Sequence, residues 1–187
     1  LAYSTIAHAG YMLVGLAAVA SRTVDGVSIG SETLLFYLVG YAVTNLAAFF
    51  AIMAIMERTR SELIESFAGM SQRAPWLALA LSIAVLSLTG IPPTVGFMAK
   101  LFVFGAAIKA DLAWLVALGA VNSVISAYFY LRVIRVMYLA EPKGDERPPH
   151  IIPLDISVAV TAAAVVALGV WPKGLLEIAD RAVQQIF

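Results

Sequence analysis

Hydrophobic residues along the chain gather in five long segments that polar stretches separate. A membrane-spanning helix needs about 20 consecutive, mostly apolar residues, and each of these segments reaches that length. The pattern therefore predicts an all-α, polytopic membrane protein with one membrane domain over residues 1–187. The predicted spans are 1–20, 33–56, 75–108, 112–139 and 151–171.

Two further segments, 57–74 and 173–187, are amphipathic. In the first, charged residues are interspersed with apolar ones at helical spacing, namely Leu63, Ile64, Phe67 and Met70. Such spacing is typical of a helix with one apolar face. We therefore expect both segments to lie at the membrane surface rather than across it.

The segment 75–108 crosses the membrane either once or twice, and the basic residues distinguish the two topologies. Lys and Arg near spans are enriched on the cytoplasmic side. Two crossings would place five basic residues on one side and six on the other, which shows no such bias. One crossing places seven on one side and four on the other: Arg58, Arg60, Arg73, Arg132, Arg135, Lys143 and Arg147 against Arg22, Lys109, Lys173 and Arg181. We therefore predict five crossings, with the C-terminus on the outer side.

This third span is too long for one straight helix. At ~1.5 Å per residue it would be about 50 Å long, whereas the hydrocarbon core is roughly 30 Å thick. Proline lacks an amide hydrogen and breaks helices, and discontinuous helices build ion sites in transporters. The sequence thus predicts a break at residues 90–96, formed by Gly90, Pro92, Pro93 and Gly96.

Composition agrees with a membrane protein and excludes several functions. Of the 187 residues, 61% are hydrophobic and only 13% are charged, with a net charge of zero; soluble domains are nearer one half apolar and one quarter charged. A nucleic-acid binder would need a basic surface, and without cysteine the chain forms no disulfide or thiolate-ligated cluster. We find no metal site, no phosphate-binding loop and no catalytic triad. Because the sequence begins without methionine and is apolar from the start, we interpret it as the C-terminal part of a longer protein.

Lys100 is the first candidate for chemistry. It precedes Lys109 at the predicted outer boundary by nine residues, which corresponds to about 13 Å at ~1.5 Å per residue. A lysine at such depth costs about 2.5–3.5 kcal/mol on insertion scales, and ionisable groups inside membranes are usually functional. We therefore predict that Lys100 carries a proton. The alternative is a lysine that faces a polar crevice or an acidic partner for structural reasons only.

His8 is the second candidate, because it also falls near the middle of a predicted span. Histidine is the side chain best suited to proton relay near neutral pH. From the sequence alone, a neutral histidine bonded to a carbonyl or hydroxyl is an equal alternative.

Polar side chains in the second and fourth spans are weaker candidates. They either hold helices together or support water and hydrogen bonds between titrating sites. Arg132 and Arg135 are expected to anchor the fourth span at the membrane interface, and Asp155 opens the fifth span, where a helix N-terminus favours a carboxylate. The candidate supporting residues are Thr44, Asn45, Asn122, Ser123, Ser126 and Tyr128.

Three motifs in this order carry a resemblance to a known family: LAYSTIAHAGYML (1–13), YLVGYAVTNLAAFF (37–50) and LSLTGIPPTVGFMAKLFVF (86–104). The chain resembles the antiporter-like membrane subunits of NADH-quinone oxidoreductase (respiratory complex I), subunit N above all, over nearly its whole length. The wider group includes subunits L and M and the Mrp-type cation/proton antiporters.

This resemblance implies a subunit of fourteen helices in two inverted repeats, of which the chain holds the last five. It places Lys100 on the lysine of the second broken helix, where subunit M typically has glutamate, and His8 near the central hydrophilic axis. It also implies proton translocation without a cofactor in this chain. NADH, flavin, iron–sulfur clusters and quinone are then expected in partner subunits, and subunit M and small membrane subunits as neighbours in a bacterial plasma membrane.

Two other functions remain open at this point. An Mrp-type antiporter would exchange Na⁺ for H⁺, although a sodium site favours carboxylates and the spans contain none except Asp155 at an edge. A structural membrane subunit without transport would tolerate the loss of Lys100 and His8.

Overall fold

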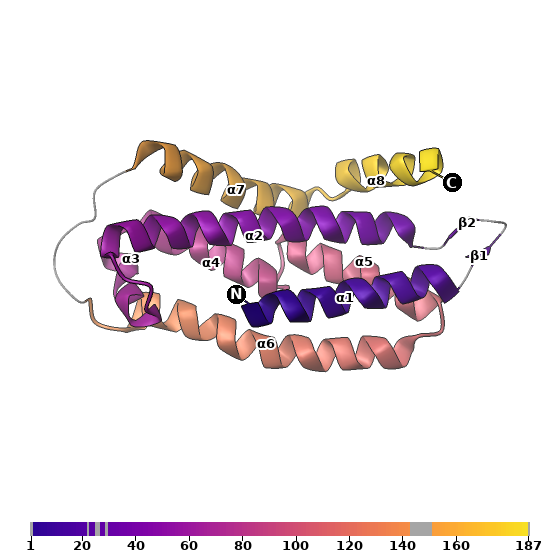
Figure 1. Ribbon diagram of the computed structural model, residues 1–187, viewed down its shortest axis with the longest axis horizontal. Helices are drawn as coiled ribbons and strands as arrows, with labels where there is room; N and C mark the ends of the chain where they lie inside the picture. Colours follow the sequence, from indigo (N-terminus) through magenta and orange to yellow (C-terminus); the bar gives the residue numbers. More distant parts are fainter. Residues whose placement is uncertain (1, 22, 25–26, 29, 143–150, 187) are drawn as a thin grey trace.

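The apolar segments form helices that run roughly along the longest axis of the molecule (Figure 1). The computed structural model describes residues 2–21, 23–24, 27–28, 30–142 and 151–186. Of the residues used above, Arg22, Lys143 and Arg147 lie outside the described residues. The longer helices are α1 (Ala2–Ser21), α2 (Ser31–Thr59), α4 (Pro75–Thr89), α5 (Val95–Lys109), α6 (Ala113–Leu139), α7 (Ile152–Val170) and α8 (Lys173–Ile186).

The third span is discontinuous, as predicted. Helices α4 and α5 have 15 residues each, about 22 Å at ~1.5 Å per residue, which is too short to cross a bilayer alone. They lie end to end along the long axis, so that together they form one crossing (Figure 1). Helices α1, α2, α6 and α7 are long and apolar enough to cross by themselves. The all-α fold with a broken third span is thus confirmed.

Helix α2 lies at the centre of the bundle and packs against α1, α4, α5, α7 and α8. Its buried face is made mainly of small residues, which let neighbouring helix backbones approach closely. At Gly40, an added Cβ would lie only 2.9 Å from a methyl of Val95 in α5. Four alanines of this face are almost completely buried: Ala47, Ala48, Ala51 and Ala54.

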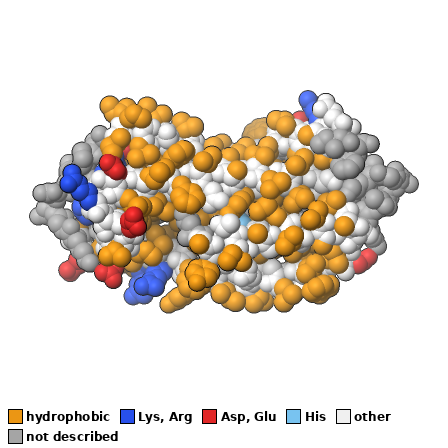
Figure 2. Space-filling view, viewed as in Figure 1, with side chains coloured by type: hydrophobic (Ala, Val, Ile, Leu, Met, Phe, Trp, Pro, Cys, Tyr) orange, Lys and Arg blue, Asp and Glu red, His pale blue; other side chains and the backbone are white. Residues whose placement is uncertain are grey.

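The outside of the bundle is largely apolar. Figure 2 shows hydrophobic side chains over the middle of the molecule and charged ones toward its ends. Helix α6 buries few residues and exposes many large apolar ones, such as Val124, which is 74% exposed. Such a surface suits contact with lipid or with another membrane subunit.

The connections between the spans are short elements. Thr23–Val24 (β1) and Val27–Ser28 (β2) pair antiparallel between α1 and α2. The segment after α2 contains the 3-10 helix η1 (Ile64–Phe67) and α3 (Met70–Arg73), separated by Gly69 at φ 63. Phe67 and Met70 are buried there, so that part of the amphipathic segment packs against the bundle.

The last span ends beside the helix break. Gly169, in the last turn of α7, contacts the backbone at Pro93 and Val95 so closely that a Cβ would overlap it. Helix α8 then continues along the N-terminal part of α2 (Figure 1). It is amphipathic, with Leu175, Leu176 and Ala179 toward the bundle and charged residues exposed. Its position at the membrane surface stays a prediction.

Candidate functional site at the helix break

Helix α4 ends because Gly90 adopts the left-handed conformation, with φ 89. Its amide donates to the carbonyls of Leu86 and Ser87, and the amide of Ile91 also donates to Leu86. Positive φ carries no steric cost for glycine, and this arrangement is a common helix C-terminus. The chain then turns through the two prolines to Thr94, which precedes α5.

At the end of α4, two backbone carbonyl groups have no amide hydrogen in the following turn to accept from. In a continuous helix, the carbonyls of Leu88 and Thr89 would accept from the amides four residues later. Those residues are Pro92 and Pro93, which have no amide hydrogen. The ammonium of Lys100 takes the place of both donors, with its Nζ 3.2 Å from the carbonyl oxygen of Leu88 and 2.8 Å from that of Thr89.

Lys100 is enclosed by further polar and aromatic groups. Its side chain is only 7% exposed, and its Nζ donates to the hydroxyl of Ser123 in α6 at 3.3 Å. The same Nζ lies 4.8 Å from the centre of the Tyr11 ring in α1. In the part of the chain that the structure describes, no carboxylate pairs with Lys100. Its positive charge is therefore stabilised by carbonyls at the negative end of a helix and by an aromatic face.

His8 also contacts Tyr11 and lies in a cluster of tyrosines. It is 3% exposed, and its Nδ1 shares a hydrogen bond of 2.8 Å with the hydroxyl of Tyr37. Its ring stacks on Tyr41 with centroids 4.7 Å apart and meets Tyr11 edge-on at 5.6 Å. Tyr11 thus contacts both sequence-predicted titratable residues.

A small cavity adjoins the His8 cluster. Its volume is about 10 Å³, close to the roughly 10–15 Å³ that one water requires. Two buried polar atoms of its lining residues, Nε2 of His8 and the hydroxyl of Tyr41, have no hydrogen-bond partner among the described residues. The cavity is lined by His8, Tyr37, Tyr41, Thr44, Ser87, Gly96 and Ala99.

A chain of hydrogen bonds joins this cavity to the break. The hydroxyls of Thr44 and Ser87 lie 3.0 Å apart, and the amide of Gly96 donates to the hydroxyl of Ser87 at 3.1 Å. The chain therefore links α2 to both halves of the broken helix. Thr44, predicted as a supporting residue, is part of it.

The other predicted supporting residues divide into two groups. Asn122 and Ser123 both donate to the hydroxyl of Tyr11, at 3.2 and 2.9 Å, and so belong to the surroundings of Lys100. Asn45 and Ser126 are half-buried. Tyr128 is 71% exposed and contacts the ring of Phe129, so the structure does not bring it to the site.

Sequence reasoning missed four residues of the site: Tyr11, Tyr37, Tyr41 and Ser87. A signal for three of them was present. Tyr37 and Tyr41 are spaced with Thr44 as one face of a helix, and Tyr11 follows His8 by three residues. Ser87 sits in an apolar stretch like many packing serines, so that only its contacts distinguish it.

Gly96 allows the two half-helices to approach each other, and a methyl group there is expected to destabilise the protein. A Cβ would overlap the carbonyl of Ser87, a backbone group that cannot rotate away. We expect Gly96→Ala to lower the free energy of unfolding by about 1–3 kcal/mol and to lower the melting temperature of the purified full-length protein. Gly105→Ala in the same helix is the matched control, because its Cβ meets nothing within 4 Å. Equal melting temperatures for the two variants would contradict this account of the break.

The arrangement provides a buried lysine whose ammonium can give up a proton and whose neutral amine can accept one, surrounded by hydroxyl groups from other helices. Hydroxyls both donate and accept hydrogen bonds, so Ser123 and Tyr11 can pass a proton to or from Lys100. The described residues contain no group of three His, Cys, Asp or Glu side chains that could hold a metal ion.

Comparison with known proteins identifies similar sequences. A family model described as "NADH:quinone oxidoreductase/Mrp antiporter, TM" matches residues 1–126. The NADH-quinone oxidoreductase subunit N of Dehalococcoides mccartyi is 46% identical over 186 residues, which is 100% of this chain and 38% of that protein. The protein of the same name from Chloroflexus aggregans is 40% identical over 182 residues, covering 97% of this chain and 36% of the relative.

Solved structures show the same fold. A chain of the Mrp complex from Dietzia sp. superposes with a TM-score of 0.84 at 23% identity, covering 97% of this chain and 41% of that one. A chain of respiratory complex I from Thermus thermophilus with bound aureothin gives a TM-score of 0.66 at 24% identity, covering 94% and 44%. The chain thus spans 36–38% of the length of the two curated relatives.

Proposed function

Because the chain belongs to the NADH:quinone oxidoreductase/Mrp antiporter transmembrane family, we propose that it is the C-terminal part of a subunit N that translocates protons. The proposal places it in a membrane-bound NADH-quinone oxidoreductase. The names of its relatives support the complex. The buried ammonium of Lys100 at the helix break supports the activity.

The contacts of Lys100 carry the proposal. In the protonated state its three N–H groups can donate to Leu88, Thr89 and Ser123, which are its three acceptors here. A neutral amine has one N–H group fewer and a lone pair, so release of the proton requires one of these three contacts to break or, at the Ser123 hydroxyl, to reverse its direction. Proton transfer is thereby coupled to the hydrogen bonds that Lys100 makes with the broken helix and with α6.

Tyr11 joins this site to the rest of the proposed path. Its hydroxyl accepts from Ser123, which also contacts Lys100, and its ring meets His8. His8, Tyr37 and the small cavity beside them form the next part of the path toward α2. Protons then move within the bundle between Lys100 and His8.

The redox chemistry belongs to partner subunits in this proposal. NADH, flavin, iron–sulfur clusters and quinone are bound there, and charge changes in neighbouring membrane subunits, subunit M among them, drive Lys100 through its proton cycle. The subunit lies in the bacterial plasma membrane with its C-terminus on the outer side.

Replacement of Lys100 tests the function. We expect Lys100→Ala in the full-length protein to leave the complex assembled but to reduce sharply the number of protons moved per NADH oxidised. The measurement is NADH-driven proton uptake in proteoliposomes, with NADH oxidation in the presence of an uncoupler as the control for assembly. Unchanged proton uptake would contradict the proposal and favour a structural subunit.

Cation/proton antiport is a second candidate, supported by the fold shared with the Mrp complex. The same proteoliposomes distinguish it, because an antiporter would move Na⁺ against H⁺ and lose the sodium flux with Lys100. A sodium site favours carboxylate oxygens, and among the described residues the hydrogen-bond partners of Lys100 are two carbonyls and a hydroxyl, with no carboxylate. We therefore place proton translocation first.

A further inference from the structure

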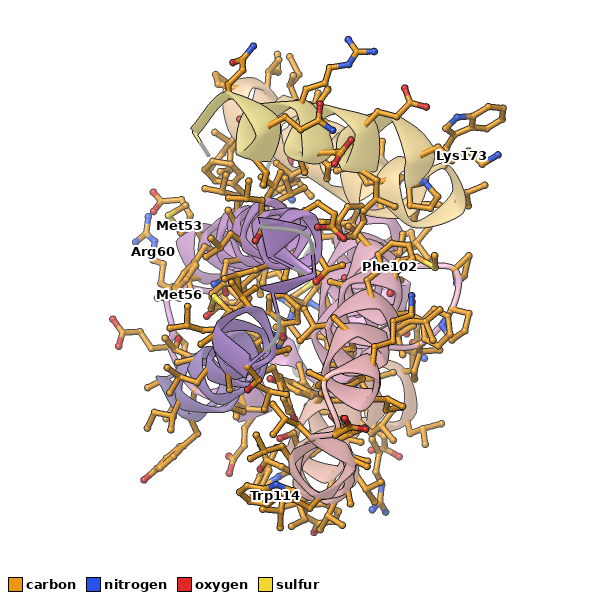
Figure 3. All side chains as sticks on the ribbon, turned by 90° about the vertical axis from the view of Figure 1, so that its right-hand side faces the viewer. Met53, Met56, Arg60, Phe102, Trp114 and Lys173 are labelled. Carbon is orange, nitrogen blue, oxygen red and sulfur yellow. The ribbon has the colours of Figure 1, made fainter. Side chains whose placement is uncertain are left out.

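An open groove lies at the C-terminal end of α2, away from the Lys100 site. Its volume is about 550 Å³, within the range of roughly 300–1,000 Å³ typical of small-molecule sites. Its apolar walls include Met53, Met56 and Leu154, and its polar rim includes Glu57, Arg60 and Glu62. Figure 3 shows Met53, Met56 and Arg60 on one side of the bundle.

The backbone after α2 builds the rim. The backbone of Arg60 is left-handed, with φ 50, and its amide donates to the carbonyl of Met56 at 2.7 Å. A non-glycine residue in this conformation is uncommon, and here it reverses the chain so that Ser61 and Glu62 return to the groove. Ile151 and Leu154 form the opposite wall. The ion pair between Arg58 and Asp155 holds this first turn of α7 against α2.

The rim carries charges of both signs at the level where the apolar span ends. Glu57, Arg60 and Glu62 are exposed, and within the described residues no ion pair engages any of them. Charged side chains at this level meet lipid head groups. Two carboxylates and one guanidinium are complementary to a head group that has both an ammonium and a phosphate.

An apolar strip continues from the groove along α2. Met53, Phe49 and Leu46 follow each other at helical spacing and are 44%, 49% and 49% exposed. They run from the charged rim toward the middle of the span, as an acyl chain runs from its head group. The groove and this strip together match an amphiphile rather than a soluble ion.

We propose that this groove binds a zwitterionic aminophospholipid such as phosphatidylethanolamine. Its ammonium lies against Glu57 and Glu62, its phosphate accepts from Arg60, and one acyl chain follows Met53 and Phe49. Bidentate contact with phosphate is a common role of arginine. The site is independent of proton transfer at Lys100.

Lipid retention by the full-length protein tests the site. The purified protein is washed in detergent, incubated with phosphatidylethanolamine, phosphatidylcholine or phosphatidylglycerol, and bound lipid is counted by native mass spectrometry. We expect phosphatidylethanolamine to be retained most. Phosphatidylglycerol has no ammonium group, and the quaternary ammonium of phosphatidylcholine has no N–H groups to donate to the carboxylates. Equal retention of phosphatidylglycerol and phosphatidylethanolamine by the unmodified protein would overturn the proposal.

Variants separate the two halves of the head group. The double variant Glu57→Gln/Glu62→Gln should reduce retention of phosphatidylethanolamine about fivefold, as for loss of one or two exposed ion pairs. Arg60→Gly, which keeps the left-handed backbone, should weaken all three lipids. Glu177→Gln on α8 is the matched control and should change nothing. Retention of phosphatidylethanolamine by the double variant at the unmodified level would also overturn the proposal.

Discussion

Replacing Pro92 and Pro93 with alanine is expected to restore stability, but not proton transfer, to a protein that lacks the Lys100 ammonium. In the Lys100→Ala variant the carbonyls of Leu88 and Thr89 lose the donor that now satisfies them. Leaving one buried acceptor without a partner costs about 1–3 kcal/mol. For the two carbonyls together we expect a loss of about 2–6 kcal/mol.

Alanine at positions 92 and 93 supplies amide hydrogens four residues after these carbonyls. Helix α4 can then extend by about one turn and satisfy both groups from its own backbone. We expect the triple variant Lys100→Ala/Pro92→Ala/Pro93→Ala to regain at least half of the lost melting temperature. Proton uptake should stay as low as in Lys100→Ala, because no titratable group has returned to the site.

Thermal unfolding of the purified full-length proteins measures the first effect, and proton uptake in proteoliposomes the second. Pro172→Ala in the Lys100→Ala background is the matched control, because Pro172 lies outside the broken helix. A triple variant no more stable than Lys100→Ala would show that the ammonium does not act as a substitute donor. Recovery of proton uptake in the triple variant would remove Lys100 from the mechanism.

Loss of the carboxylate of Asp155 should have the second large effect on stability. Nη2 of Arg58 lies 2.6 Å from one oxygen of Asp155 and 2.8 Å from the other, and the Arg58 side chain is only 2% exposed. Breaking a buried ion pair on one side typically costs about 3–5 kcal/mol. Because Asp155 itself is 19% exposed, we expect Asp155→Ala to cost about 3 kcal/mol, the lower end of that range.

Two variants show whether the cost comes from the isolated charge. Glu32→Ala removes an acidic residue from the first turn of α2 and should change the melting temperature much less. Arg58→Leu/Asp155→Leu removes both charges and should be more stable than Asp155→Ala, because no buried charge is left without its counterion. If Asp155→Ala melted at the same temperature as Glu32→Ala, the ion pair would not hold α7 against α2.

Several features of the site were predictable from residues close together in the sequence. The break in the third span and the candidacy of Lys100 follow from an apolar run that is too long and contains two prolines and one lysine. Even the two unpaired carbonyls follow from the positions of Pro92 and Pro93, since helical donors lie four residues ahead. Only the structure shows that the Lys100 ammonium replaces the missing amide donors.

The tyrosines were not predicted, although helical spacing places Tyr11 near His8 and Tyr37 and Tyr41 near Thr44, because such spacing shows which residues share a helix face but not which face meets the site. Tyr128 was expected to support the site and lies on the exposed face of α6, whereas Tyr11 was not expected and contacts both Lys100 and His8. The choice between them depends on how α1 and α6 are rotated about their axes. That rotation is set by packing against the rest of the bundle.

The sequence by itself determined the all-α fold with its apolar spans, the place of the break and the lysine beside it. These follow from burying consecutive apolar residues and from amides that proline lacks, which are local properties. Only the tertiary structure decided which groups surround Lys100. Ser123 and Tyr11 are 112 residues apart, and their hydrogen bond forms only because packing of the small residues of α2 and of the two half-helices brings α1, α5 and α6 together.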